Sequence, residues 1–126
     1  QGVVGRLGTV RENTAEVILI TDPRDGNSIG GVVSRTGNMV IVTGGGQYRG
    51  ECSVKPAVES YFINIKTGDL IVTSETSEIY PRGIPIGRIS QIDKMANNLV
   101  SKASLKPAVN LGLLQTVYVI KVKRDE

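Results

Sequence analysis

Short runs of β-branched residues constrain the fold of this 126-residue chain more than any other feature of its sequence. Val and Ile dominate runs such as 16–21, 39–43 and 70–73, and each run ends at residues that favour turns. Strands that recur about every 8–12 residues are typical of small barrels and sandwiches. The sequence therefore predicts an all-β fold with roughly ten short strands.

Two of these runs, 16–21 and 39–43, are apolar at successive positions, which is typical of strands covered on both faces. Pro56 is expected to end the strand that precedes it, because proline has no amide hydrogen to donate to a ladder. Residues 117–123 alternate between two faces and form the last predicted strand. Helix is expected only as a turn or two within 107–115.

The chain contains no His and a single Cys, and these absences exclude most catalytic and metal sites. Ser-His-Asp and Cys-His catalysis, His-ligated zinc or haem and internal disulfides are all excluded. Cys52 is expected to be a small buried side chain, because no His and no Lys-Arg cluster adjoins it. We therefore predict that the chain is not an enzyme and has no catalytic, cofactor-binding or metal-binding residues.

Two further motifs have structural interpretations that outweigh functional ones. The Gly44-Gly45-Gly46 run lacks the Lys and Ser or Thr of a phosphate-binding loop, so a hairpin or β-bulge is expected there. Asp69 follows Gly68 in a predicted turn, where its carboxylate is expected to accept hydrogen bonds from backbone amides.

The formal net charge is +3, and the 15 basic residues are spread along the sequence. Proteins that bind nucleic acid usually concentrate positive charge on one face and add aromatic side chains for base stacking. This chain has four Tyr, one Phe and no Trp. We therefore expect a solvated surface and no nucleic-acid partner.

The segment 79–88 combines Pro and Gly with large apolar residues, which is unusual for a loop between strands. Two alternatives explain it: the segment folds over the end of a barrel, or it presents a rigid apolar surface to another protein. The predicted partner-binding residues are Ile79, Tyr80, Pro81, Ile84 and Pro85. Tyr80 is the most informative of them, since tyrosine is common at interface hot spots and also costly to remove from a core.

The same segment belongs to a longer motif that resembles the signature of the MreC family of rod shape-determining proteins. The motif runs from Gly68-Asp69-Leu70-Ile71-Val72-Thr73-Ser74 through Tyr80-Pro81-Arg82-Gly83-Ile84-Pro85-Ile86-Gly87-Arg88-Ile89. Upstream segments at 3–6, 18–23 and 35–37, and a later one at 108–119, are similar to other family motifs in the same order. The chain departs from the family at Ser74-Glu75-Thr76-Ser77-Glu78, which contains no Gly where the family has a Gly-rich turn.

The resemblance implies two small six-stranded-type β-barrels. Residues 1–27 are expected to be the remainder of a first barrel, incomplete because a family member has one further strand before the position of Val3. Residues 28–126 would form the second barrel, and the C-terminal strand could pack on either one; the turn-rich cluster at 22–27 marks the boundary. The chain begins at Gln1 without an initiator Met, so we interpret it as a fragment.

For function, the resemblance implies a non-catalytic scaffold of the bacterial wall-elongation machinery. It would maintain rod cell shape through protein-protein contacts and self-association as dimers or longer assemblies. The implied partners are MreD, the elongation-specific penicillin-binding protein and, indirectly, the MreB filament. The parent protein would be anchored in the inner membrane, with this region periplasmic or otherwise extracytoplasmic. The alternative is a stand-alone barrel that binds an oligonucleotide or oligosaccharide.

Overall fold

A computed structural model of the chain describes residues 2–24, 26–46, 50–57, 64–75, 80–94, 100–111 and 119. The described residues form eight β-strands and no α-helix, which confirms the predicted all-β class. The strands are β1 (Gly5–Val10), β2 (Ala15–Leu19), β3 (Ser28–Val33), β4 (Met39–Thr43), β5 (Cys52–Pro56), β6 (Leu70–Thr73), β7 (Pro85–Lys94) and β8 (Val100–Pro107).

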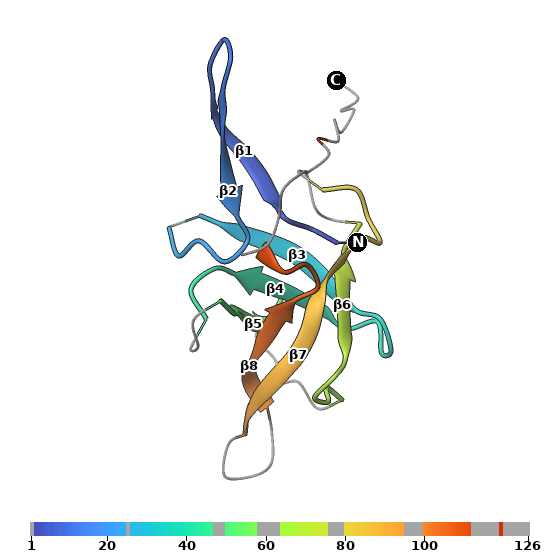
Figure 1. The fold of residues 1–126 in the computed structure, drawn as a ribbon. Coiled ribbons are helices and arrows are strands. Elements are labelled where there is room, and N and C mark those ends of the chain that lie inside the picture. The colour runs from blue at the N-terminus through green and yellow to red at the C-terminus, as the bar shows by residue number, and fades with distance from the viewer. Residues whose placement is uncertain are drawn as a thin grey trace.

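Six of the strands close into a barrel, and the other two form a separate hairpin (Figure 1). Around the barrel the order is β3-β4-β5-β8-β7-β6, and β6 pairs with β3 to close the ring. Every neighbouring pair is antiparallel. The prediction of six-stranded barrels is therefore confirmed for one barrel. That barrel lies within the range predicted for the second barrel, and the stretch expected to be the remainder of a first barrel contains the two-stranded β1–β2 sheet.

The barrel interior is the main hydrophobic core. Successive residues of a strand point to opposite faces, so every second residue of each barrel strand can point inward. All six barrel strands contribute buried apolar side chains: Val33, Val40, Val42, Cys52, Val54, Ile71, Ile86, Ile89 and Leu105. A barrel this small has room only for side chains, and mainly Val, Ile and Leu fill it.

The prediction that 16–21 and 39–43 are covered on both faces is wrong. In β4, Val40 and Val42 are buried, whereas Met39 is 47% exposed. In β2, Ile18 is buried, but Val17 is 42% exposed. A closed barrel has one interior, so the outward face of β4 stays in contact with solvent. The β1–β2 hairpin projects from the barrel, and most of β2 is exposed (Figure 1).

Several predicted strand positions agree with the structure. β4 and β6 coincide with the predicted 39–43 and 70–73, and β5 ends at Pro56 as expected. β7 begins at Pro85, because the first position of a strand tolerates a residue without an amide hydrogen. The predicted strand at 117–123 lies outside the described residues apart from Val119, and so does part of 107–115.

Candidate functional site

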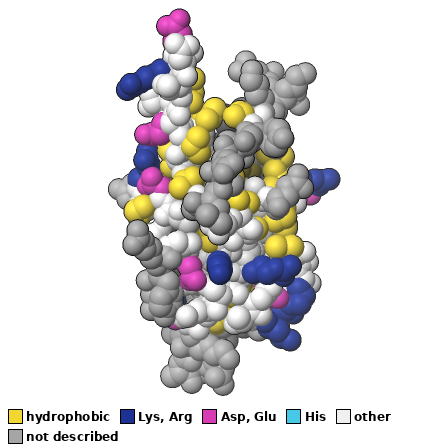
Figure 2. All heavy atoms as spheres, viewed as in Figure 1, with side chains coloured by type: hydrophobic (Ala, Val, Ile, Leu, Met, Phe, Trp, Pro, Cys, Tyr) yellow, Lys and Arg dark blue, Asp and Glu magenta, His cyan; other side chains and the backbone are white. Residues whose placement is uncertain are grey.

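The residues predicted to bind a partner lie in the connection from β6 to β7, at the end of the barrel from which the hairpin projects (Figure 1). We call residues 80–85 the Pro-Gly segment. Pro81, Ile84 and Pro85 are each half-buried, and Ile79 lies outside the described residues. Hydrophobic side chains reach the surface at this end, around the base of the hairpin (Figure 2). The structure thus brings four of the five predicted residues to one end of the barrel.

Thr73, the last residue of β6, holds the Pro-Gly segment in place. Its side chain is buried at 1% exposure, and its hydroxyl donates to the carbonyl of Pro81 at 2.5 Å and accepts from the amide of Ile84 at 2.8 Å. The backbone of Thr73 also accepts from Gly83 and donates to Ile84, each at 2.9 Å. Gly83 has a φ of +81°, which favours glycine. Thr73 therefore fixes the segment as a tight turn folded back on β6.

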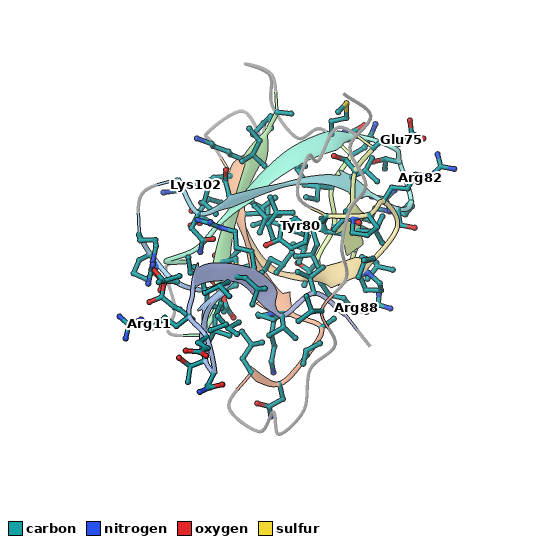
Figure 3. The ribbon with its side chains drawn as sticks, turned by 90° about the horizontal axis from the view of Figure 1, so that it is seen from above. Arg11, Glu75, Tyr80, Arg82, Arg88 and Lys102 are labelled. Atoms are coloured by element: carbon teal, nitrogen blue, oxygen red, sulfur yellow. The ribbon has the colours of Figure 1, made fainter. Side chains whose placement is uncertain are left out.

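Tyr80 belongs to the hydrophobic core and is only 8% exposed. Ile84 packs against the same core. Burial raises the pKa of the Tyr80 hydroxyl, because the low-polarity surroundings disfavour its charged form. Seen from above, Tyr80 lies toward the middle of the ring of strands (Figure 3). This burial favours the alternative in which Tyr80 covers the end of the barrel, and it leaves little of the side chain to contact another protein.

The N-terminal residues hold the other side of the segment. The amide of Val3, which is itself buried, donates to the carbonyl of Pro85 at 2.8 Å. A Cβ atom on Gly2 would lie 2.9 Å from the same carbonyl oxygen, so the two backbones are in close contact. The amide of Ile20 donates to the carbonyl of Val4 at 3.0 Å. The Pro-Gly segment is thus fixed between β6 and the stretch that leads into the hairpin.

The tip of the Pro-Gly segment carries an exposed ion pair. Arg82 Nη1 lies 2.5 Å from Glu75 Oε1, and the two side chains are 73% and 75% exposed. Pairs of this kind contribute little to stability in water, typically about 0–1 kcal/mol. The side chains at the tip are therefore accessible to other molecules.

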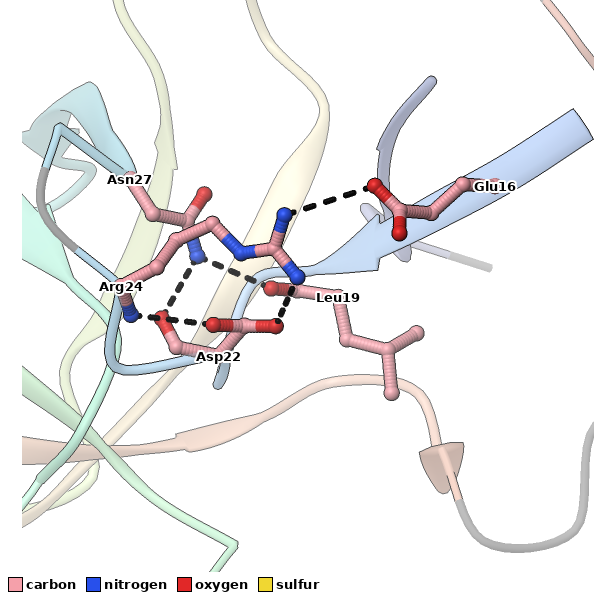
Figure 4. A network of polar contacts seen from close by, with 5 residues as sticks. All are labelled: Glu16, Leu19, Asp22, Arg24 and Asn27. Atoms are coloured by element: carbon pink, nitrogen blue, oxygen red, sulfur yellow. Dashed lines mark hydrogen bonds and ion pairs between the residues drawn. The ribbon is translucent and has the colours of Figure 1, made fainter. Parts of the chain in front are cut away.

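A polar network fixes the connection between β2 and β3, and therefore the hairpin relative to the barrel (Figure 4). Arg24 donates to Glu16 on β2 at 3.4 Å and to Asp22 at 3.0 Å, and the hydrogen bond to Asp22 lowers the pKa of that carboxyl. The side-chain amide of Asn27 donates to the carbonyls of Leu19 and Asp22 at 3.0 and 2.8 Å. Because Asn27 is only 5% exposed, water competes poorly for these bonds.

The Gly44-Gly45-Gly46 run packs against this same connection. It follows β4 in the antiparallel β4–β5 hairpin, as the sequence predicted. A Cβ atom on Gly44 would lie 1.9 Å from the carbonyl oxygen of Asp22, and the amide of Gly45 donates to the carbonyl of Thr21 at 3.1 Å. The glycines thus allow two backbones to approach closely.

Asp69 joins two turns that are far apart in the sequence. Arg35 donates to both carboxylate oxygens of Asp69, each at 2.9 Å, and Asp69 is only 9% exposed. The carboxylate also accepts from the backbone amide of Lys66 at 2.8 Å, which confirms the predicted role in the turn. Arg35 was not predicted, because nothing in the local sequence indicates a partner 34 positions away.

Cys52 is fully buried as predicted, and burial raises the pKa of its thiol to about 12, far above that of a reactive thiol. In the described part of the chain, no group of three or more His, Cys, Asp and Glu residues could hold a metal ion. The same part contains no helix that is long and apolar enough to cross a membrane.

Comparison with known sequences identifies a matching family and relatives of this chain. The family model described as rod shape-determining protein MreC, barrel core, matches residues 1–121. The cell shape-determining protein MreC of Haemophilus influenzae is 31% identical over 120 residues, which cover 95% of this chain and 33% of that protein. That of Caulobacter vibrioides is 31% identical over 87 residues, which cover 69% of this chain and 23% of that protein. The chain thus spans a third or less of the length of these relatives.

Solved structures share the fold. One described as MreC has a TM-score of 0.75 at 26% identity, covering 90% of this chain and 61% of the other. The crystal structure of MreC from Pseudomonas aeruginosa has a TM-score of 0.68 at 27% identity, covering 85% of this chain and 67% of the other. Because the family match extends over residues 1–121 and the fold agrees, this chain belongs to the MreC family and contains its barrel core.

Proposed function

We propose that this chain is part of a non-catalytic scaffold that maintains bacterial cell shape through protein-protein contacts in the wall-elongation machinery. The match to the MreC barrel core over residues 1–121 carries this proposal. Its named relatives are cell shape-determining proteins. The barrel end supports it too, because the buried polar groups of Thr73 and Asn27 position backbone segments and hold a defined surface.

The proposed partners follow from family membership. They are MreD, the elongation-specific penicillin-binding protein and, indirectly, MreB, together with further copies of the chain itself. We further propose that the parent protein is anchored in the inner membrane and that this region is periplasmic or extracytoplasmic.

The proposed contact surface is the outer side of the Pro-Gly segment. Pro81, Ile84 and Pro85 are half-buried and retain exposed apolar atoms, and Arg82 at the tip is exposed. The hydrogen bonds to Thr73 hold this backbone rigid before a partner arrives, so little conformational entropy is lost on binding. In this proposal Tyr80 acts from inside, by anchoring the segment to the core.

A chimera tests the function. The segment of the Haemophilus influenzae protein that matches this chain would be replaced by this chain, in cells depleted of their own copy. A scaffold role predicts that the chimera restores the normal ratio of cell length to cell width. A second chimera with Ile71→Asp, which places a charge in the fully buried core, should fail to restore shape because the barrel unfolds.

The level of each chimera in the envelope fraction is the control. Cells that remain misshapen although the first chimera accumulates normally would overturn the proposed function. Normal shape with the Ile71→Asp chimera would overturn it as well, because a folded barrel would then be dispensable.

A further inference from the structure

Three basic side chains from separate stretches of the sequence lie around the Thr67-Gly68 turn, and a fourth lies beside one of them. Arg35, Lys66, Arg88 and Lys106 are all exposed, and we call them the basic patch. Arg35 binds Asp69, and Arg88 Nη1 donates to the carbonyl of Gly68 at 2.9 Å. The positive charge of Lys66 helps to lower the pKa of Asp69. The space-filling view shows Lys and Arg side chains gathered on this side of the barrel (Figure 2).

In the described part of the fold, the like charges of Arg88 and Lys106 are not neutralised, although Arg88 also donates to the carbonyl of Gly68. The two residues lie directly opposite each other in the β7–β8 ladder, where like charges destabilise a sheet. No carboxylate among the described residues forms an ion pair with either of them. Asp69, the carboxylate at this turn, is already bound to Arg35 and to the amide of Lys66. An anionic group from another molecule would relieve the repulsion.

A shallow apolar depression lies beside these two cations. It is lined by Leu70, Pro85, Arg88, Lys106, Pro107 and Ala108. Leu70 lies opposite Arg88 in the β6–β7 ladder, so an apolar side chain and a cation are neighbours on the outer surface. The site thus offers apolar contact and positive charge within the same small area.

We propose that this depression binds an acidic segment of a partner protein, with an apolar side chain against Leu70 and carboxylates on Arg88 and Lys106. The proposal deepens the scaffold function and rests on it, because it names the chemistry of one partner contact. Charge complementarity favours an acidic ligand, and the apolar lining favours protein over nucleic acid. None of the six lining residues is aromatic, so the depression has no side chain for base stacking.

The test uses the purified chain and a fluorescein-labelled peptide of alternating Glu and Leu, with binding measured by fluorescence anisotropy. Lys106→Glu should weaken binding by about tenfold or more. Lys55→Glu makes the same change of charge at an exposed position on β5, away from the depression, and should weaken binding by less than about threefold. Lys106→Glu should also keep or raise the melting temperature, because it places an opposite charge across from Arg88.

Three results would overturn the proposal. The first is equal weakening by Lys106→Glu and Lys55→Glu, which would indicate only net charge. The second is equally tight binding of polyglutamate of the same charge, which would show that apolar contact does not contribute to binding. The third is tighter binding of a single-stranded DNA of the same charge, which would indicate a nucleic-acid site. The chimera and the peptide assay are independent tests. If the chimera fails to restore shape while the peptide binds as expected, the scaffold function is wrong. If the chimera restores shape while the peptide does not bind, the proposed peptide site alone is wrong.

Discussion

At the scale of single residues, a substitution of Tyr80 distinguishes the two alternatives for the Pro-Gly segment, covering the end of the barrel or docking another protein. Tyr80→Ala should lower the free energy of unfolding by about 3–5 kcal/mol, because a buried aromatic side chain leaves a cavity. Urea denaturation measures this. Arg82→Ala, an exposed change in the same segment, should alter stability by about 0.5 kcal/mol or less. Wild-type stability of Tyr80→Ala, together with weaker binding to the elongation-specific penicillin-binding protein, would instead assign the ring to docking.

Asp69 should make stability depend on pH. The hydrogen bond from Arg35, helped by that from the Lys66 amide, lowers the pKa of Asp69 from its ordinary value of 3.8. A carboxyl with a lower pKa in the folded state stabilises the protein above about pH 4, and this contribution is lost as the pH falls through the folded pKa. Asp69→Asn should therefore cost about 1–2 kcal/mol at neutral pH, and the difference from wild type should shrink as the pH approaches about 2.

Urea denaturation at several pH values checks this prediction. Asp93→Asn is the matched control, because Asp93 lies 3.8 Å from Lys102 in an exposed pair and should contribute little. A stability difference between wild type and Asp69→Asn that stays constant across this pH range would contradict the ion pair as its cause.

At the scale of elements, the β2–β3 connection packs closely on the Gly44-Gly45-Gly46 run, and this contact should stabilise the position of the hairpin. Gly44→Ala should cost about 2–3 kcal/mol, because the new methyl group would overlap the carbonyl oxygen of Asp22. Gly37→Ala is the control. Gly37 has a φ of +79° and open space around its Cβ position, so this change should cost only about 1–2 kcal/mol of backbone strain. Equal melting temperatures of the two variants would refute the close contact.

At the scale of the whole molecule, the hairpin is the expected site of self-association. Leu7 and Val17 lie opposite each other in the β1–β2 ladder and are 41% and 42% exposed. β1 and β2 pair only with each other among the described strands, and a strand without a second neighbour can pair with another chain. We therefore predict concentration-dependent association in sedimentation velocity, reduced by Val17→Lys.

Met39→Lys is the matched control for this prediction, since Met39 is 47% exposed on the outer surface of the barrel. It should leave association unchanged. Equal effects of the two lysine substitutions would mean that association depends on net charge, and a purely monomeric wild type would reject the prediction outright.

The sequence by itself determined the all-β class and the positions of strands such as β4 and β6. It also determined the buried state of Cys52 and the turn role of Asp69. These features depend on interactions over a few neighbouring residues: alternation of side chains, restricted backbone angles at Gly and Pro, and local hydrogen bonds. Such interactions can be inferred from the sequence without knowing which strands pair.

Only the tertiary structure decided which faces are covered, where Tyr80 lies and how the charges are arranged. Closing β3 onto β6 gives the barrel one interior, so Met39 stays exposed while Tyr80 enters the core. The same closure gathers basic side chains that are scattered in the sequence, and it brings Arg35 to Asp69. The physical reason is that pairing between distant strands depends on the sum of many weak contacts, none of which leaves a local pattern in the sequence.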